Sequence, residues 1–583
     1  MKGGAGMGRT GPTVRRPAAA DPETGGLLGP GPGGLPGGLP GGEPDAEPGG
    51  LSGREPDGPP GREPDGPPGR EPDGPSGPPG GEPGPSDGPP HRGVRRRTAA
   101  AAVLAPAAVM LALGLWGLDR GTMWRDESAT FQVARRSLPE IWHLLGTIDA
   151  VHGLYYLLMH AVLAVRDDEL ALRVPSVLAT AATAALVGAI GCRLARPRVG
   201  LWAGLLYATT PFVSHYAQEG RSYALVATGA ALATWLLIRA VEHPSYGRWT
   251  GYGAVVGITA LLHEFAILLL AAHGLTLLLS RAAWRTWRGW GCAASAAALA
   301  LLPLALFSQG QSGQVSWIRT PGPEEAEALL RAFAGPADTV LAGTLLLAAV
   351  ALLAPRPRTG GLHLGAVALP LALVPPVLLY AAAQWQPLFL DRYLLFCLAG
   401  VPLLAASGAD RVLGLLPLPP RGRPAVAAAG VAVVAAAFAG QLPEQERERL
   451  PGSRGDELAR TAAVVGRVAR PGDAVLFLPL HERRVALAYP RDFAGLRDLT
   501  LERSPAASGT LFGEEVPATE LRARLARLPA SGRVWVVSDT NAGDRWIRSQ
   551  RAEHAKTTVL GELYREESSV FVRGGAVSLY VRR

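Results

Sequence analysis

The distribution of apolar and polar residues divides the chain into three parts. Residues 1–97 are almost all polar residues, glycine and proline, residues 98–440 contain repeated long apolar runs, and residues 441–583 mix short apolar and polar segments. Apolar runs of about 18 or more residues with few charges are typical of membrane-spanning helices. The pattern predicts an all-α bundle that crosses a membrane many times, preceded by a tail and followed by a separate domain.

About eleven apolar runs in the middle part fit this description. They lie near residues 98–118, 171–191, 200–215, 222–240, 250–263, 265–280, 290–307, 338–354, 364–383, 393–409 and 424–440. The two runs on either side of His263 are short, and one re-entrant pair is an alternative to two spans.

Arginine-rich loops predict which ends of these spans face the cytoplasm. The segments "CRLARPR", "SRAAWRTWR" and "APRPR" fall on alternate sides of the span count, and "HRGVRRRT" precedes the first span. Cytoplasmic loops carry an excess of Lys and Arg. We therefore expect a multi-pass protein of the plasma membrane with a cytoplasmic N-terminus. The external face then receives residues 119–170, residues 308–337 and the C-terminal part.

The three parts differ in the structure that they predict. In the tail, the unit "GREPDGPP" starts at Gly53, recurs at Gly61 and returns as "GREPDGPS" at Gly69, and such a segment has almost nothing to bury, so disorder is expected. In the loop 119–170, "ATFQVARRSLPEIWHLL" and "GLYYLLMHAVLAV" have apolar residues at helical spacing, which predicts helices in the membrane interface or packed on the bundle.

Residues 441–583 predict a small extracytoplasmic α/β domain. "GDELARTAAVVGRVA" indicates an amphipathic helix and "DAVLFLP" a buried strand, "TELRARLARLPASGRVWVVSD" repeats helix and strand, and "SSVFVRGGAVSLYVRR" indicates a closing hairpin. Acceptor recognition and a role as a lid or stabilising module are both open for this domain. "HERR" at 481–484 and "SDTNAGDR" at 538–545 are expected to be exposed loops.

Composition changes this picture little. The formal net charge of +8 is explained by arginines in cytoplasmic loops and does not indicate a nucleic-acid partner. The three cysteines, Cys192, Cys292 and Cys397, lie in or at the ends of apolar runs, so we interpret them as small apolar residues without a disulfide or metal role.

Candidate chemistry gathers at the external ends of six segments. The residues are Asp126 and Glu127, His152, Arg173, Glu219 and Arg221, His263 and Glu264, and Asp391 and Arg392. Any one of these groups alone is explained by an ion pair at a helix end. Six segments with such groups at one membrane depth favour a polar cavity at the outer leaflet, because charges near a bilayer are costly unless paired or functional.

The residues limit the chemistry of this cavity. The spans contain no glycine-rich phosphate loop, and nucleotide-activated donors are not available outside the cell, so an activated group must arrive on a lipid carrier. A carboxylate can act as general base on an acceptor hydroxyl, and arginines can stabilise a departing phosphate. A transporter or lipid flippase is the alternative, although such a protein should carry its charges at mid-depth, often in two related halves.

Six motifs, in order, carry a resemblance to a known family. They are the Asp-Glu pair at 126–127, "HGLYYLLMH", "LRVPSVL", "QEGRSYAL", "HEFAILLLAAH" and "DRYLL". With these motifs the chain resembles the membrane glycosyltransferases of the C-type fold. Within them it is similar to bacterial relatives of protein O-mannosyltransferases and of the aminoarabinose transferases that act on lipid A (glycosyltransferase families 39 and 83).

The resemblance implies a polyprenyl-phosphate sugar donor, a mannose- or arabinose-like sugar, transfer with inversion, and Asp126 as the catalytic base beside Glu127. It also implies that Arg173 serves the donor phosphate, and we assign Arg221 and Arg392 to the same phosphate. Supporting or substrate-binding roles are expected for His152, Tyr155, Glu219, His263, Glu264, Asp391 and Tyr393. The acceptor, a cell-envelope glycan, lipid or protein, stays open.

Two positions depart from the family pattern. Gly153 follows His152 where family members often have proline, and Glu264 stands where many have an aromatic residue. The second departure adds a carboxylate to the site and leaves the substrate and metal dependence open. A divalent cation, Mg²⁺ or Mn²⁺, held by Asp126, Glu127 and His152 is one alternative.

Overall fold

The computed structural model describes residues 90–353, 361–415 and 423–583. The disorder expected for residues 1–97 falls mostly on residues 1–89, which lie outside the described residues. The first helix, α1 (Pro90–Leu115), begins at Pro90 rather than near residue 98. Its N-terminal turns therefore extend into the segment that the sequence assigned to the tail.

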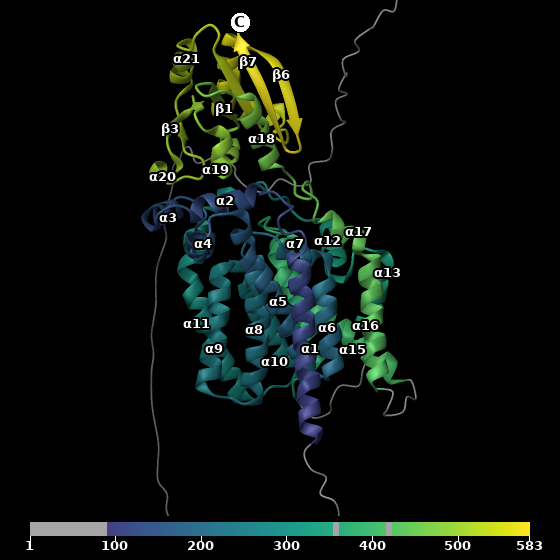
Figure 1. Ribbon diagram of the computed structural model, residues 1–583. Helices are drawn as coiled ribbons and strands as arrows, with labels where there is room; N and C mark the ends of the chain where they lie inside the picture. The colour runs from purple at the N-terminus through teal and green to yellow at the C-terminus, as the bar shows by residue number, and fades with distance from the viewer. Residues whose placement is uncertain (1–89, 354–360, 416–422) are drawn as a thin grey trace, which may run out of the picture. The chain divides into compact units, whose positions relative to one another are not determined.

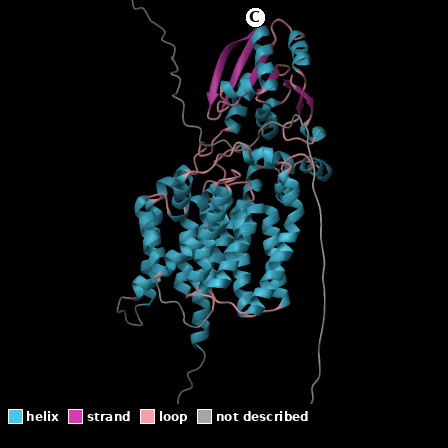
Figure 2. Cartoon of the chain, turned by 180° about the vertical axis from the view of Figure 1, so that it is seen from behind, coloured by secondary structure: helices cyan, strands magenta, loops and turns pink. Residues whose placement is uncertain are grey.

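The helices of the bundle follow the predicted apolar runs (Figures 1 and 2). After α1 they are α5 (Glu169–Leu194), α6 (Pro197–Thr209), α7 (Pro211–Ala217), α8 (Tyr223–Glu242), α9 (Tyr246–Leu262), α10 (Leu269–Leu279), α11 (Trp284–Gln309), α12 (Pro323–Ala334), α13 (Asp338–Leu352), α14 (Leu364–Ala382), α15 (Gly400–Gly414), α16 (Arg423–Gly440) and α17 (Leu442–Arg447). Short 3-10 helices join some of them: η2 (Glu264–Leu268), η3 (Ser312–Val315) and η4 (Asp391–Cys397).

The structure contains fewer helices of membrane-spanning length than the apolar pattern of the sequence predicts. Within the described residues, five helices are long and apolar enough to cross a membrane, or up to seven if each of two bent helix pairs is one span. The run near 200–215 is divided between α6 and α7 at Pro211, because a proline disfavours helical geometry in the residue before it. The run near 250–280 is interrupted where His263 adopts an extended backbone.

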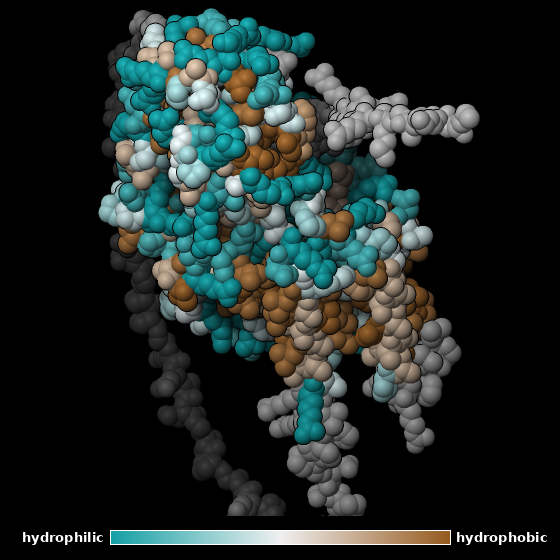
Figure 3. Space-filling view, turned by 45° about the horizontal axis from the view of Figure 1, so that its top comes forward, coloured by the Kyte–Doolittle hydropathy of each residue, from teal (hydrophilic) through white to brown (hydrophobic). Residues whose placement is uncertain are grey.

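Small residues allow the helices of the bundle to approach closely. Helix α5 packs against α6 and α8, α8 against α9, and α9 against α11. A Cβ atom added to Gly200 on α6 would lie 2.3 Å from the carbonyl oxygen of Gly188 on α5. Such close approach is typical of helix pairs in membranes, where packing replaces the hydrophobic effect as the main attraction. Hydrophobic surface accordingly gathers on the bundle, while hydrophilic surface covers most of the C-terminal α/β domain (Figure 3).

The loop 119–170 forms helices, as its spacing predicts. They are α2 (Arg125–Ala134), α3 (Leu138–Leu145), η1 (Ala150–His152) and α4 (Gly153–Val165). Every residue of α2 is buried, and α2 contacts both α4 and the C-terminal domain. Helix α3 begins with a capping box formed by Ser137 and Glu140. The Trp142 side chain of this helix is 77% exposed. An exposed Trp suits the membrane interface.

The C-terminal part contains the predicted helices, strands and hairpin. The five-stranded sheet has the order β2-β1-β5-β7-β6, with β1 parallel to β2 and β5, and β7 antiparallel to β5 and β6. Its strands are β1 (Ala474–Leu478), β2 (Arg497–Asp498), β5 (Arg533–Ser538), β6 (Tyr564–Val572) and β7 (Gly575–Arg582), and β3 (Leu501–Arg503) pairs separately with β4 (Glu514–Glu515). The helices are α18 (Leu458–Val468), α19 (Arg484–Ala488), α20 (Pro505–Ser508), α21 (Ala518–Ala526), α22 (Asp544–Ser549) and α23 (Arg551–Leu563), with η6 (Leu480–Arg483) and η7 (Pro490–Phe493).

Candidate active site

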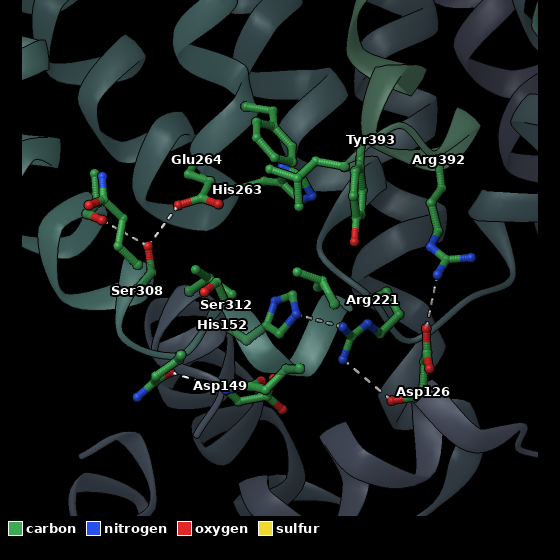
Figure 4. Close-up of a pocket in the computed structure, with 18 of the residues that line it drawn as sticks. Asp126, Asp149, His152, Arg221, His263, Glu264, Ser308, Ser312, Arg392 and Tyr393 are labelled. Atoms are coloured by element: carbon green, nitrogen blue, oxygen red, sulfur yellow. Dashed lines mark hydrogen bonds and ion pairs between the residues drawn. The ribbon is translucent and has the colours of Figure 1, made fainter. Parts of the chain in front are cut away.

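A polar cavity of about 290 Å³ lies where the first loop meets the ends of several bundle helices (Figure 4). It is bounded by residues from α2, η1, the turn before α8, η2, the end of α11, η3 and η4. Seven predicted site residues line it: Asp126, His152, Arg221, His263, Glu264, Arg392 and Tyr393. The expected polar cavity is therefore present at one end of the bundle.

Asp126 is the buried carboxylate of this cavity. Its side chain is fully buried in the first turn of α2, and neither carboxylate oxygen has a hydrogen-bond partner among the described residues. Arg392 Nη2 lies 4.0 Å from Asp126 Oδ2. Burial raises the pKa of Asp126 to about 6, although Arg221 and Arg392 act against this rise. Asp126 thus combines free lone pairs with a pKa close to neutrality, as a general base requires.

Arg221 connects Asp126 with His152. Its Nη1 donates to the backbone oxygen of Asp126 over 3.4 Å and to Thr130 Oγ1 over 3.2 Å, while its Nη2 lies 2.8 Å from His152 Nε2. Since a guanidinium only donates, His152 Nε2 accepts, and the imidazole is neutral. Burial, and then the charge of Arg221, hold the pKa of His152 well below its usual range. His152 is therefore a fixed neutral group rather than a cation at this site.

Glu127 and Arg173 form a buried ion pair beside the cavity rather than in it. Arg173 Nε and Nη2 donate to Glu127 Oε1 and Oε2 over 2.9 and 2.8 Å, and Gly220 N donates to Oε1 over 2.8 Å. Arg173 Nη1 also donates to the carbonyl oxygens of Leu118 and Gly121. Neither Glu127 nor Arg173 is among the cavity residues. In this arrangement both charges are already paired.

Three more predicted residues lie outside the cavity lining. Glu219 Oε2 accepts from Arg454 Nη1 over 3.1 Å. Tyr155 is fully buried, and its hydroxyl has no hydrogen-bond partner among the described residues. Asp391 is exposed, and its Oδ1 accepts from the backbone N of Arg392 over 2.6 Å. The geometry gives these side chains supporting positions at most.

Aromatic and hydrogen-bonding side chains line the rest of the cavity. The His263 and Tyr393 rings lie 4.7 Å apart, and Ser308 Oγ donates to Glu264 Oε2 over 3.1 Å. Figure 4 shows Glu264 and Ser308 on one side of the cavity and Asp126 and Arg392 on the other. A molecule that fills the space would thus meet hydrogen-bonding groups on the wall opposite the carboxylate.

Sequence reasoning missed several residues of the cavity lining. Asp149, which has a positive φ of 61°, accepts from the Tyr156 hydroxyl over 2.7 Å. In the orientation that satisfies both its amide atoms, Gln314 also bonds Asp149, and Gln311 Oε1 accepts from Ala150 N over 2.9 Å. The available signal was the polar segment "SQGQSGQVSW" at 308–317, which follows an apolar run directly.

Comparisons with known proteins concern the fold that carries this site. The family profile described as dolichyl-phosphate-mannose-protein mannosyltransferase matches residues 153–308. ArnT from Cupriavidus metallidurans in the apo state has a TM-score of 0.56 at 12% sequence identity, over 82% of this chain and 98% of that chain. The same enzyme bound to undecaprenyl phosphate has a TM-score of 0.54 at 14% identity, over 82% and 97% of the two chains.

The chain has the C-type glycosyltransferase fold. The identities are too low to carry more than the fold. No curated protein sequence matches the chain.

Within this C-type fold, the predicted cation site is not assembled. The ligand atoms of Asp126, Glu127 and His152 do not converge, since Glu127 is held by Arg173 and Gly220, and His152 Nε2 by Arg221. Among the described residues, the group with converging ligand atoms is His481, Glu482 and Asp539 in the C-terminal domain.

The position of that group also corrects the sequence interpretation of residues 481–484 and of Asp539, whereas Thr540, Asn541 and Gly543 in the second segment are exposed as predicted. Glu482 and Asp539 are buried, not exposed, and Arg484 pairs with both carboxylates. Arg125 Nη2 lies 4.0 Å from Asp539 Oδ2. Two guanidinium groups therefore occupy the surroundings that a cation would need, and we interpret the cluster as an ion-pair network.

Proposed function

We propose that the protein is a membrane glycosyltransferase that moves a sugar from a polyprenyl-phosphate carrier to an acceptor hydroxyl on the external face of the plasma membrane. The observation that carries this proposal is Asp126, a buried carboxylate with two unbonded oxygens in a cavity that also contains two arginines. The family description and the undecaprenyl phosphate bound to ArnT support a polyprenyl-phosphate donor.

The cavity residues divide the reaction between them. An Asp126 oxygen takes the proton of the acceptor hydroxyl while the hydroxyl oxygen forms a bond to the anomeric carbon. The bond from that carbon to the phosphate oxygen breaks, and the polyprenyl phosphate leaves with both electrons. Arg221 and Arg392 stabilise the charge that develops on this phosphate. Attack opposite the leaving group inverts the anomeric configuration.

No step of this reaction requires a cation, because the two guanidinium groups supply the positive charge at the phosphate. Dependence on Mg²⁺ or Mn²⁺ stays an open alternative, and activity in the presence of a chelator tests it. The transporter alternative has less support, because the cavity charges gather at one end of the bundle.

We propose a mannose- or arabinose-like sugar and a glycan, lipid or protein acceptor of the cell envelope. The test is incubation of the purified full-length protein with labelled polyprenyl-phosphate mannose or polyprenyl-phosphate arabinose and membrane acceptors. Movement of label from the lipid donor to an acceptor supports the proposal. Failure of both donors to lose label to any acceptor, while each still binds the protein, contradicts it.

The titration of Asp126 should appear in the pH dependence of transfer. A general base must be deprotonated, and the pKa of Asp126 is raised to about 6. We expect kcat/KM to be constant above this pH and to fall about tenfold per pH unit below it. Rates measured from pH 4.5 to 8.5 check this, because the donor phosphate is a diester that stays singly ionised over the whole range. If kcat/KM instead falls only near the usual aspartate pKa of about 4, burial does not raise the pKa of the catalytic carboxylate.

The orientation in the membrane gives a second prediction. The proposed function requires the cavity and the C-terminal domain to be external, because lipid-linked donors are used there. A reporter that is active only outside the cytoplasm should be active after Arg583 and inactive in the loop near Arg196. The reverse pattern would place the cavity in the cytoplasm and remove the argument for a lipid-linked donor.

A further inference from the structure

Two buried charges of the C-terminal part contact the membrane domain next to the cavity. Arg454 and Asp456, which we call the 454–456 clamp, lie between α17 and α18, and both side chains are more than 90% buried. Asp456 Oδ2 accepts from Arg125 Nε over 2.9 Å, and Oδ1 accepts from the Arg125 backbone N over 3.3 Å. Asp456 thus binds both the side chain and the backbone of the residue that precedes Asp126.

The other half of the clamp holds the segment that carries Arg221. Arg454 Nη1 donates to Glu219 Oε2 over 3.1 Å, and Nη2 donates to the carbonyl oxygens of His215 and Gln218 over 3.1 and 3.4 Å. Glu219 lies two residues before Arg221. Asp456 therefore binds the residue directly before the proposed base. Arg454 binds a residue two positions before Arg221, a proposed phosphate ligand.

The sheet of the C-terminal domain contacts the 454–456 clamp through the turn between β6 and β7. Glu457 N donates to the carbonyl oxygen of Arg573 in the turn between β6 and β7 over 3.1 Å. The next residue, Gly574, has a positive φ of 79°, and a Cβ atom there would lie 2.7 Å from Asp456 Cβ. Only glycine fits this turn without displacing Asp456. The clamp is therefore held against the turn between β6 and β7.

A third contact restrains α2 from the same side. The Tyr489 hydroxyl accepts from Met123 N over 3.1 Å and donates to Glu169 Oε1 over 2.8 Å. Together with Asp456 it fixes the backbone at residues 123 and 125, immediately before the base. Asp456, Arg454 and Tyr489 thus contact the segments that carry Asp126 and Arg221.

We infer that Arg454 and Asp456 are positioning residues, through which the C-terminal domain sets the placement of Asp126 and Arg221. This inference rests on the proposed function for the roles of those two groups. It gives the C-terminal domain a role at the active centre. The sequence had left two roles open for this domain, acceptor recognition and a lid or stabilising module. Displacement of a reacting group by about 1 Å can cost about 100-fold in rate, so a clamp at this place affects turnover even though it touches no substrate.

The alternative is that the clamp only attaches the domain to the bundle. The two roles separate on Asp456→Asn, which keeps the side-chain shape and removes the charge. Positioning predicts a kcat about 10- to 100-fold lower with a donor KM within about threefold of the original. Attachment alone predicts a less stable protein whose folded fraction turns over at the original rate.

The matched control is Asp473→Asn in the same domain. Asp473 accepts from Arg533 and from Trp535 Nε1, so its replacement also breaks an ion pair of the domain, but these partners belong to β5 and not to the bundle. We expect it to lower the stability of the domain without changing kcat. On the other half of the clamp, Arg454→Gln should lower kcat, and Arg454→Lys should restore part of the loss because it keeps the charge at Glu219.

A double-mutant cycle shows whether Asp456 acts through Arg125. If it does, Arg125→Gln with Asp456→Asn should be no slower than the slower single variant. Hydrogen exchange of the full-length protein in nanodiscs gives a readout that needs no sugar. Exchange should rise in residues 123–130 for Asp456→Asn and in residues 215–222 for Arg454→Gln, and stay unchanged in β5 and β7.

The outcomes distinguish this inference from the proposed function. An Asp456→Asn protein that is folded, with original exchange and kcat, would overturn the inference while an inactive Asp126→Asn protein keeps the function. If the original protein moves no label from either lipid donor, the proposed function fails, whereas raised exchange in the clamp variants would still support positioning. Equal losses of kcat in Asp456→Asn and Asp473→Asn would also overturn the inference, because they would indicate general destabilisation.

Discussion

Asp126→Asn should lower the turnover number by about 100-fold or more, the usual contribution of a general base. The substitution keeps the size and shape of the side chain and removes the basic lone pair that takes the acceptor proton. Because the Asp126 oxygens form no hydrogen bonds among the described residues, the change breaks no hydrogen bond of the described fold. The substitution relieves the desolvation of the Asp126 carboxylate but leaves the buried Arg392 guanidinium, 4.0 Å away, without that charge, so the net change in stability should be small.

The measurement is single-turnover transfer from the labelled donor, with the thermal midpoint of the purified protein recorded beside it. Asp167→Asn is the control, because Asp167 lies in the same loop but is about half exposed and pairs at the surface with Arg135. It should leave both rate and stability unchanged. A folded Asp126→Asn protein with the original rate would remove Asp126 as the base and leave the cavity without one of the predicted catalytic groups.

The site could be predicted from the sequence as far as membrane depth and charge decide it. Asp126, His152, Arg221 and Arg392 all follow from one argument, that charged groups at the same end of several spans are costly unless they meet. The fold was predictable for a related reason, since long apolar runs indicate where helices lie, although only five to seven spans of sufficient length occur among the described residues. The comparisons with ArnT confirm the C-type fold that the ordered motifs imply.

Sequence position could not show which way each side chain points. Asp126 and Glu127 are neighbours, but successive residues on a helix point about 100° apart. One therefore faces the cavity and the other faces Arg173. The sequence prediction assigned both carboxylates to catalysis and Arg173 to the donor phosphate. That assignment assumes that Asp126 and Glu127 both point into the cavity.

Contacts between distant segments were equally out of reach. Arg125 and Asp456 are 331 positions apart, and neither side of the pair carries a local pattern that names the other. Gln311 and Gln314 were missed because amide side chains in a loop have no periodicity, and their role depends on the fold of the first loop at Asp149. In both cases the contact joins two loops that are far apart in the sequence and adjacent in the fold.

The ion pair of Arg173 and Glu127 gives the largest expected effect on stability. Arg173→Met leaves the Glu127 carboxylate buried, with Gly220 N as its remaining partner among the donors now bound to it. Removal of one member of a buried ion pair costs about 3–5 kcal/mol. We expect a strong fall in the thermal midpoint and in the yield of folded protein. Arg173→Lys should also be destabilising, because an ammonium group cannot reproduce the two parallel bonds to the carboxylate or the bonds to Leu118 and Gly121.

The double variant Arg173→Met with Glu127→Gln separates structure from phosphate binding. It removes both charges, and the amide oxygen introduced at position 127 can still accept from Gly220 N, so most of the lost stability should return. If Arg173 only pairs with Glu127, the stable double variant should turn over with an unchanged donor KM. If Arg173 leaves Glu127 to bind the donor phosphate during the reaction, the double variant should be stable but show a donor KM or kcat at least about tenfold worse. The first result would leave the phosphate to Arg221 and Arg392, which line the cavity beside the carboxylate of Asp126.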